Sequence, residues 1–285
     1  MRMYQKICLI LFSLLLLGGN AIAQDKAVRI LAIGNSFSED AIEQHLFELA
    51  EAEGVLTIIG NMYIPGCSLE RHVSNARENA AAYAYRKVGL DGKKVETLNM
   101  SLEKVLADEK WDYVSLQQAS PLSGIYHTYA AHLPELIAYL KTRLPKHTKL
   151  ILHQTWAYAG TSNHDGFRNY QKNQLTMYHA ITAAVKRAAK DNKIDIIVPS
   201  GTAIQNARTS YIGDHLDRDG YHLGIPVGRY TAACTWFECI FRRKVVGNRY
   251  RPHEMSDREV RVAQTAAHLA VKHPGKVTNL KKYGL

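Results

Sequence analysis

A serine stands where a short apolar run meets a helix-like pattern near the start of the chain. In the stretch ILAIGNSFSED, Gly34 and Asn35 lead directly into Ser36. Two interpretations of Ser36 stay open from these residues alone. Ser36 caps a helix, since Ser36-x-x-Glu39 matches a capping box. Alternatively, Ser36 is a nucleophile at the end of a strand, which requires a base, an orienting acid and donors for an oxyanion.

A base and an acid occur together near the other end of the chain, in the stretch DHLDRDGYHLG. Asp219 and His222 form the one Asp-x-x-His pattern of the sequence, in a polar segment typical of a loop. A carboxylate three residues before an imidazole can accept a hydrogen bond from Nδ1–H. That bond leaves Nε2 free to take a proton from a serine. The alternative is an Asx-type turn with an exposed histidine.

Apolar runs alternate with helical periodicity along the chain. The predicted strands cover residues 28–33, 55–63, 113–117, 149–154 and 194–199. The predicted helices cover residues 38–52, 69–83, 101–108, 129–144, 166–191, 223–241 and 256–273. Continuous β-branched runs separated by helices predict a three-layer α/β/α sandwich on a mostly parallel, flavodoxin-like sheet of five strands. Ligands of such folds bind beyond the carboxyl ends of the strands.

One segment breaks this alternation. Residues 85–99 carry Asp91-Gly92 between short alternating runs, which predicts a small β-hairpin inserted near the carboxyl edge of the sheet. The sequence shows no repeat, low-complexity tract or linker-like stretch. Residues 24–285 are therefore predicted to form a single domain.

The first 23 residues have the pattern of a secretory signal peptide. Arg2 and Lys6 precede an apolar run at residues 7–17, and the small residues Ala21 and Ala23 follow it. The run is shorter than the ~20 apolar residues of a membrane-spanning helix. The segment therefore predicts export, with no stable membrane anchor and with a mature chain that begins near Gln24. The expected location is periplasmic or extracellular.

Composition narrows the classes of partner. The formal net charge is +10, which suits acidic glycans or anionic surfaces, or else reflects lysines scattered over solvated faces. Export argues against a nucleic-acid partner. Beyond the signal, Cys67, Cys234 and Cys239 are too few for a disulfide framework. Metal-ligand spacings are lacking in the sequence, so no metal is expected. The oligomeric state is left open.

Together the serine and the Asp-x-x-His pattern resemble the SGNH (GDSL-like) hydrolase superfamily. GNSFS is similar to its first block and DGYH to its last, although Asn35 stands where an aspartate is usual. The stretches YIPGCSLERH, WDYVSLQQASPLSG, HQTWAYAG, MYHAI and PSGTAIQNARTS resemble a secreted bacterial branch classed as a domain of unknown function. The resemblance implies a triad in which Ser36 is the nucleophile, His222 the general base and then acid, and Asp219 the residue that orients His222.

The resemblance also implies an oxyanion hole made by the nucleophile's amide, a glycine after the second strand and an asparagine after the third. Ser36 provides the first donor, and Gly66 matches the second, although Pro65-Gly66 is also an ordinary turn pair. The third position departs from the pattern, because the chain reads LQQAS there. A glutamine amide can donate as an asparagine does, and adjacent strand residues point to opposite faces. Gln118 is the predicted donor, with Gln117 as the alternative.

Such a triad transfers an acyl group to water and needs no metal or organic cofactor. The expected function is that of a carbohydrate esterase, a deacetylase that hydrolyses small acyl esters, above all O-acetyl esters, of a small molecule or polysaccharide. Trp156 and Tyr158 are expected to bind substrate, because such aromatic rings stack on sugars, unless both are buried in the core. Two alternatives stay open: a lipase or thioesterase of the same fold, and a non-catalytic glycan-binding protein.

Overall fold

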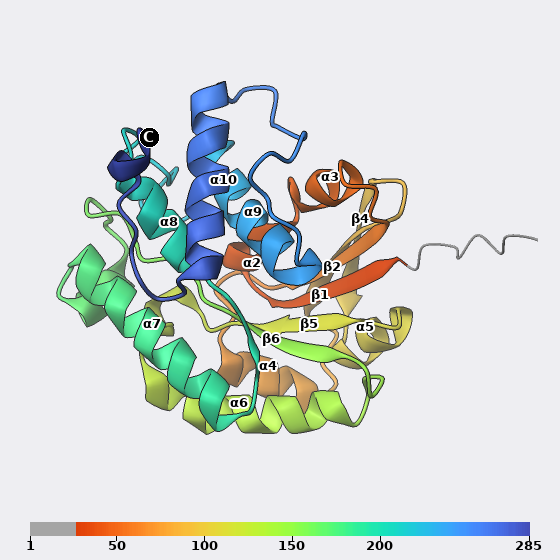
Figure 1. The fold of residues 1–285 in the computed structure, drawn as a ribbon. Helices are drawn as coiled ribbons and strands as arrows, with labels where there is room; N and C mark the ends of the chain where they lie inside the picture. The colour runs from red at the N-terminus through yellow and green to blue at the C-terminus, as the bar shows by residue number, and fades with distance from the viewer. Residues whose placement is uncertain (1–26) are drawn as a thin grey trace, which may run out of the picture.

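The computed structural model describes residues 27–285, and the predicted signal peptide lies outside them (Figure 1). Over these residues the frame is a sheet of seven strands in the order β4-β3-β2-β1-β5-β6-β7. Its parallel strands are β1 (Val28–Gly34), β2 (Thr57–Tyr63), β5 (Tyr113–Leu116), β6 (Lys149–His153) and β7 (Ile196–Val198). Each pairs in parallel with its neighbours in that set, as predicted.

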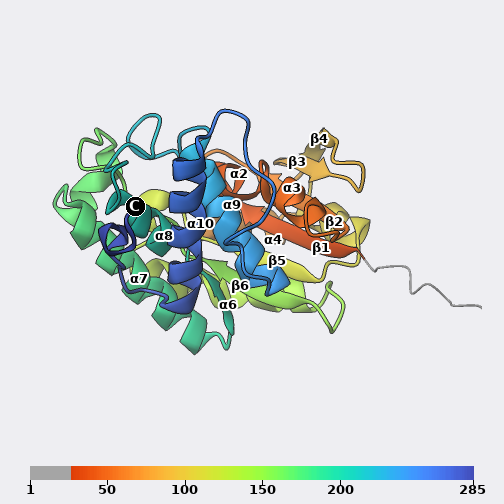
Figure 2. The ribbon, with the colours of Figure 1, turned by 45° about the horizontal axis from the view of Figure 1, so that its top comes forward.

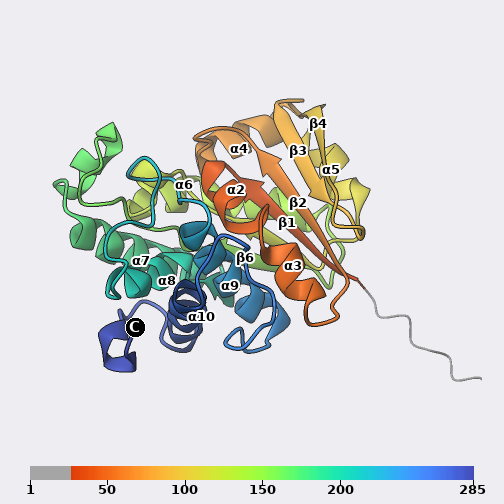
Figure 3. The same ribbon diagram turned by 90° about the horizontal axis from the view of Figure 1, so that it is seen from above.

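The predicted hairpin is part of this sheet and not a separate insertion. Its strands β3 (Tyr83–Val88) and β4 (Lys94–Met100) pair antiparallel with each other, and β3 pairs antiparallel with β2. Figures 2 and 3 show β4 and β3 continuing the row of strands beyond β2. Alternate side chains of β3, including Tyr83 and Tyr85, are buried. The described sheet therefore has seven strands where the sequence predicts five, because the pairing of β3 with β2 adds the hairpin to the sheet.

Helices cover both faces of the sheet, which makes the three layers predicted. In Figure 1 the sheet crosses the middle of the molecule, with one layer of helices below it and the other above. The lower layer holds α4 (Leu69–Arg77), α5 (Leu102–Asp108), α6 (Tyr126–Lys141) and α7 (Gln174–Asp191). The upper layer holds α2 (Ser36–Ile42), α3 (Leu46–Glu51), α8 (Ser200–Arg208), α9 (Val227–Phe241) and α10 (Asp257–Lys272). Short 3₁₀ turns are η1 (Ser120–Leu122), η2 (Asp165–Tyr170) and η3 (Leu280–Tyr283).

Two predicted helices are interrupted in the structure, and one helix was not predicted. The helix expected at 38–52 is two helices, because His45 between them adopts the left-handed conformation at φ 70°. The helix expected at 166–191 begins as η2 and resumes as α7 after Gln171 and Lys172, which also have positive φ. Helix α8 was not predicted. Its sequence, SGTAIQNAR, is short, begins with Ser200-Gly201 and contains several polar residues that favour loops, although all nine residues are buried.

The described part of the chain contains no helix that is both long and apolar enough to cross a bilayer.

Candidate active site

Ser36 is the first residue of helix α2, directly after β1 ends at Gly34. The helix cap is Asn35, whose Oδ1 accepts a hydrogen bond of 3.0 Å from the Phe37 amide. The capping-box interpretation of Ser36 is therefore wrong, since the residue that caps the helix is Asn35. A Cβ on Gly34 would lie 2.4 Å from Ser38 Oγ, so only glycine fits this tight strand-to-helix junction. The Ser36 hydroxyl is left free for another partner.

That partner is the histidine from the far end of the chain. His222 Nε2 lies 2.8 Å from Ser36 Oγ, across 186 residues of sequence. His222 Nδ1 lies 2.6 Å from Asp219 Oδ2, while Asp219 Oδ1 accepts from the amides of Tyr221 and His222 at 3.2 and 2.8 Å. The structure thus brings the three residues of the predicted triad into one hydrogen-bonded row.

The charge state of Asp219 follows from these contacts. Partial burial opposes the charged form, but the hydrogen bonds from the His222 ring and from the two backbone amides outweigh it and lower the pKa of the Asp219 carboxyl. Asp219 is therefore an acceptor at neutral pH, and His222 Nδ1 carries the donated hydrogen. His222 Nε2 is then left to accept a proton from Ser36.

A buried carboxylate links helix α2, which carries Ser36, to the loop that carries His222. Asp40, on α2, is fully buried and forms ion pairs with Arg218 and Arg229. Its Oδ2 accepts from the Leu223 amide at 2.8 Å. Burial raises the pKa of Asp40, and the two arginines act in the opposite direction. Since Leu223 follows His222, Asp40 fixes the histidine loop against the helix that carries the serine.

Replacing Asp40 by alanine is expected to lower the free energy of unfolding by about 3–5 kcal/mol. The Arg229 side chain is 7% exposed and would remain buried without its counter-charge. Urea unfolding of the purified variant measures the loss. The matched control is Glu51→Ala, an exposed acid on α3, which should change stability by about 0.5 kcal/mol at most. Similar small losses in both variants would show that Asp40 does not hold the loop.

The predicted oxyanion glycine lies in a tight turn beside Ser36. The Cys67 amide donates to the Ile64 carbonyl at 3.2 Å, and Gly66 has φ +60°, as a proline–glycine turn of this kind requires. The bond that closes the turn does not use the Gly66 amide. Asn35 Nδ2 donates to the Cys67 carbonyl at 3.0 Å and so ties this turn to the serine junction.

Gln118 does not reach this site, contrary to the prediction. Its Oε1 accepts from the amides of Leu69 and Ala119 at 3.0 and 2.9 Å, and its Nε2 donates to Thr128 Oγ1 at 3.0 Å. The side chain therefore joins the start of α4 to α6. The physical reason is that β5 ends at Leu116, so the alternation of strand side chains does not extend to Gln118.

Gln117, the alternative donor, makes a hydrogen bond to Asn35, the residue before Ser36. Its Nε2 donates to Asn35 Oδ1 at 2.8 Å, and its Oε1 lies 2.8 Å from His153 Nδ1. Burial lowers the pKa of His153 to about 3, so the ring is neutral. His153 Nδ1 donates to Gln117, and His153 Nε2 accepts from Ser200 Oγ at 2.9 Å. Both polar atoms of the Gln117 amide are thus engaged, the nitrogen with Asn35 and the oxygen with His153.

A pocket of about 330 Å³ opens over Ser36, Gly66 and His222. Six more residues line it: Glu39, Tyr63, Ser120, His164, Arg218 and Tyr221. Tyr63 and Tyr221 are aromatics near the ends of predicted strands, a position that suits a sugar-binding cleft, whereas the sequence analysis gave no substrate role to the other four. Several of them lie in the segments that follow the ends of β1, β2, β5 and β6. That position beyond strand ends is a signal in the sequence that could have identified Glu39, Ser120 and His164, and Arg218 lies next to Asp219 in the sequence.

Trp156 and Tyr158, the predicted substrate-binding aromatics, are buried and do not line the pocket. Trp156 stacks on Phe37 with ring centroids 4.4 Å apart, and its Nε1 donates to the Tyr221 carbonyl at 2.7 Å. Tyr158 OH lies 2.8 Å from Ser120 Oγ. Both aromatics therefore support residues of the pocket wall, and the prediction that they bind substrate is wrong.

Cys67, next to the glycine turn, is not an alternative nucleophile. The side chain is buried, and burial raises the pKa of its thiol to about 12. A thiol with so high a pKa is not ionised at neutral pH, and the thiolate is the reactive form.

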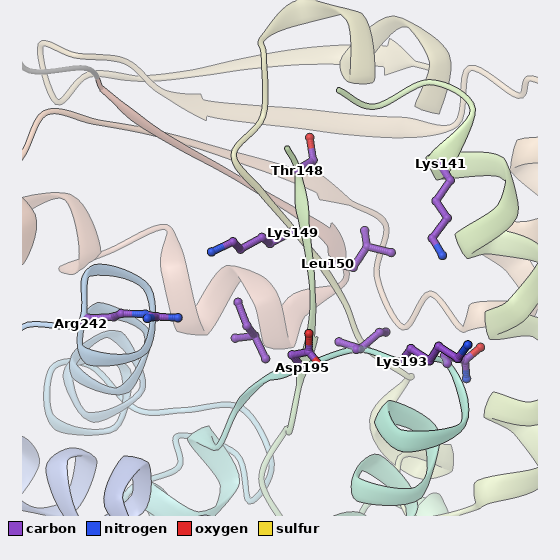
Figure 4. Close-up of a pocket in the computed structure, with 10 residues that line it drawn as sticks. Lys141, Thr148, Lys149, Leu150, Lys193, Asp195 and Arg242 are labelled. Carbon is purple, nitrogen blue, oxygen red and sulfur yellow. The ribbon is translucent and has the colours of Figure 1, made fainter. Parts of the chain in front are cut away.

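A second hollow lies at the opposite edge of the sheet (Figure 4). It measures about 340 Å³ and includes Lys149 and Ile196, the first residues of β6 and β7. Its lining holds neither a serine nor a histidine. Lys141 ends α6 and Arg242 caps α9, where positive charge stabilises helix carboxyl ends. The helix ends thus account for Lys141 and Arg242, while Lys149 belongs to β6. Because this hollow lacks a serine and a histidine, the candidate active site is the pocket over Ser36.

Comparison with solved structures agrees with this fold. A crystal structure of a DUF4886 family protein from Bacteroides uniformis ATCC 8492 is 61% identical, covers 90% of this chain and 99% of that chain, and has a TM-score of 0.89. LAE5, an α/β hydrolase enzyme from the metagenome of Lake Arreo, Spain, is similar in fold at 12% identity, with 75% and 96% coverage and a TM-score of 0.51. A member of the lipolytic protein G-D-S-L family from Veillonella parvula DSM 2008 matches at 16% identity, 76% and 100% coverage, and a TM-score of 0.48.

No curated protein matches this chain. The sequence profile of a domain of unknown function, DUF4886, matches residues 29–270. The prediction of a branch classed as a domain of unknown function is therefore confirmed. Because the profile spans most of the sequence, this chain belongs to the DUF4886 family.

Proposed function

We propose that this protein is an exported serine esterase that removes small acyl groups, most of all O-acetyl groups, from a carbohydrate. The observation that carries the proposal is the contact of 2.8 Å between Ser36 Oγ and His222 Nε2, with Asp219 2.6 Å behind the imidazole. Export rests on the signal pattern of residues 1–23, which precede the described part of the chain.

The proposed reaction uses this row of residues in two half-reactions. Ser36 Oγ attacks the ester carbonyl carbon while His222 Nε2 takes the serine proton, and Asp219 stabilises the resulting imidazolium. The amides of Ser36 and Gly66 donate to the oxyanion. His222 then protonates the leaving alcohol as its C–O bond breaks. Water attacks the acyl-enzyme in the same way, which releases the carboxylic acid and restores Ser36.

The pocket wall favours a hydroxyl-rich alcohol over a long acyl chain. Glu39, His164 and Arg218 line it together with two tyrosines. The His164 ring is held by the Gly166 amide, which donates to Nδ1 at 3.0 Å, so the neutral ring carries its hydrogen on Nε2. Polar groups of this kind bind sugar hydroxyls, whereas a fatty acyl chain needs an apolar groove. This supports the carbohydrate esterase over the lipase or thioesterase.

The proposal is tested with a series of 4-nitrophenyl esters from acetate to octanoate, followed by acetate release from acetylated polysaccharides. We expect kcat/KM to fall at least about tenfold from acetate to octanoate, because the longer acyl chain would cover polar groups of the pocket, such as Glu39 and Arg218, without offering them a hydrogen-bond partner. A rise along the series would favour a lipase. Saturable glycan binding without hydrolysis of any ester would favour the non-catalytic alternative.

A further inference from the structure

Neither Gln117 nor Gln118 is available as the third oxyanion donor, because the amide groups of both make other hydrogen bonds. Ser120 follows the two glutamines in the sequence and carries a hydroxyl. It lines the pocket together with Ser36 and Gly66. The segments that carry Gly66, Ser36 and Ser120 follow β2, β1 and β5, which are neighbours in the sheet. Because these strands are parallel, the three segments leave the same edge, with the Ser36 segment between the other two.

The hydrogen bond between Ser120 and Tyr158 fixes which hydroxyl donates. The two oxygens lie 2.8 Å apart, and Tyr158 is fully buried. The rings of His164, Phe167 and Tyr221 surround it at centroid distances of 4.9, 5.6 and 5.6 Å. Within the described residues, the phenol makes no other hydrogen bond that would take its hydrogen.

If Ser120 were the donor, the phenolic hydrogen of Tyr158 would be buried without an acceptor, a costly arrangement. Tyr158 therefore donates and Ser120 Oγ accepts. The hydrogen of the Ser120 hydroxyl is then free to turn toward the pocket. The segment is also fixed from behind, because Ser123 Oγ donates to the Ser120 carbonyl at 2.8 Å.

We propose that the Ser120 hydroxyl is the third oxyanion donor, in the place that the superfamily gives to an asparagine. Tyr158 is then a positioning residue, because its hydrogen bond holds Ser120 Oγ and leaves the serine hydrogen for the oxyanion. This inference rests on the proposed function, since it assigns a donor to the reaction that Ser36 begins.

The test compares the wild type with Ser120→Ala, Tyr158→Phe and the control Ser115→Ala. Ser115 is a buried serine in β5, and its hydroxyl has no hydrogen-bond partner, so its loss should change kcat less than about twofold. With 4-nitrophenyl acetate, Ser120→Ala should lower kcat about 100-fold with little change in KM. Tyr158→Phe should lower kcat by roughly tenfold, since the serine hydroxyl remains but is no longer held.

A second readout does not depend on the ester substrate. A fluorophosphonate labels a serine nucleophile: Ser36 Oγ would bond to phosphorus, fluoride would leave, and His222 would take the proton. The phosphoryl oxygen gains negative charge in the transition state, so Ser120→Ala should slow the labelling of Ser36 by about 100-fold as well. Mass spectrometry of the labelled peptide confirms the site.

The outcomes separate the two proposals. If the wild type is labelled at Ser36 but hydrolyses no ester, the esterase proposal fails while the labelling rates still decide the role of Ser120. Unchanged rates for Ser120→Ala in both assays would overturn the inference and leave backbone donors alone. Absence of labelling in the wild type would also overturn it, because no oxyanion would form. Should Ser120→Ala fold poorly, Ser120→Thr restores the hydroxyl and should keep most of kcat; equal losses in both would point to packing instead.

Discussion

Replacing Ser36 by alanine is expected to lower kcat for 4-nitrophenyl acetate by on the order of 10⁴- to 10⁶-fold. The proposed acyl-enzyme forms on Ser36 Oγ, and the alanine offers no atom to carry the acyl group. The hydroxyl makes its hydrogen bond to His222 at the part-exposed end of the site, and Asn35 caps the helix. The variant should therefore keep the melting temperature of the wild type while losing turnover. Steady-state kinetics and thermal unfolding together measure both effects.

Ser38→Ala is the matched control for this prediction. Ser38 lies in the same helix, and its buried hydroxyl lies between two acceptors, the Asn35 carbonyl at 2.7 Å and Asn61 Oδ1 at 2.8 Å. Its loss should reduce stability by about 1 kcal/mol and leave kcat within roughly tenfold, because Ser38 does not line the pocket. Wild-type turnover in Ser36→Ala would remove Ser36 from the mechanism. Equal losses in both variants would show that kcat depends on the packing of α2 and not on the Ser36 hydroxyl.

Much of the fold could be predicted because buried parallel strands leave a strong mark on a sequence. The parallel strands β1, β2, β5, β6 and β7 were found from continuous β-branched runs, within a few residues of their ends. The missed helix α8 is short and begins with Ser200-Gly201, a composition that is typical of a loop, so its sequence does not indicate a buried helix. The hairpin was found from Asp91-Gly92, but its pairing with β2 depends on the free edge of a sheet, which local sequence does not describe.

Those residues of the candidate site whose type is restricted by the proposed chemistry could be predicted. Residues whose role depends on contacts between distant parts of the chain could not. Ser36, His222 and Asp219 could be picked out across the chain because few residue types can serve as nucleophile, base and orienting acid, and because their two blocks resemble those of a known superfamily. Asp40 could not, because an acidic residue in the first turns of a helix is ordinary, and its partner Arg218 is 178 residues away. Only the folded chain shows that the pair joins the two halves of the site.

The aromatic prediction failed for a related reason. Residue type shows that Trp156 and Tyr158 suit a sugar-binding surface, but it does not show their burial. Both rings lie behind the pocket wall and hold Tyr221 and Ser120 through their polar atoms. The same atoms that suit a wet cleft also satisfy buried partners, so the two roles look alike in a sequence.

Replacing Asp219 by asparagine is expected to lower kcat by about 10⁴-fold with a small change in KM. The carboxylate accepts from His222 Nδ1 at 2.6 Å, whereas the amide group of asparagine can donate its NH₂ there. The imidazole then carries its hydrogen on Nε2 and cannot accept the proton of Ser36. Asparagine Oδ1 can still accept from the amides of Tyr221 and His222, so the loop should keep its shape. Kinetics at constant pH and thermal unfolding of the variant measure the two effects.

Asp219→Ala distinguishes the loss of the carboxylate charge from a change in the tautomer of His222. Alanine donates nothing to Nδ1, and the side chain of Asp219 is 39% exposed, so added formate can enter the space left behind. Formate should raise kcat of Asp219→Ala and leave Asp219→Asn unchanged, because the asparagine amide still occupies the position that the anion needs. An undiminished rate in Asp219→Asn would mean that a Ser36–His222 pair suffices and that Asp219 serves only the loop. Rescue of the alanine variant alone would identify the carboxylate as the group that sets which nitrogen of His222 carries the hydrogen.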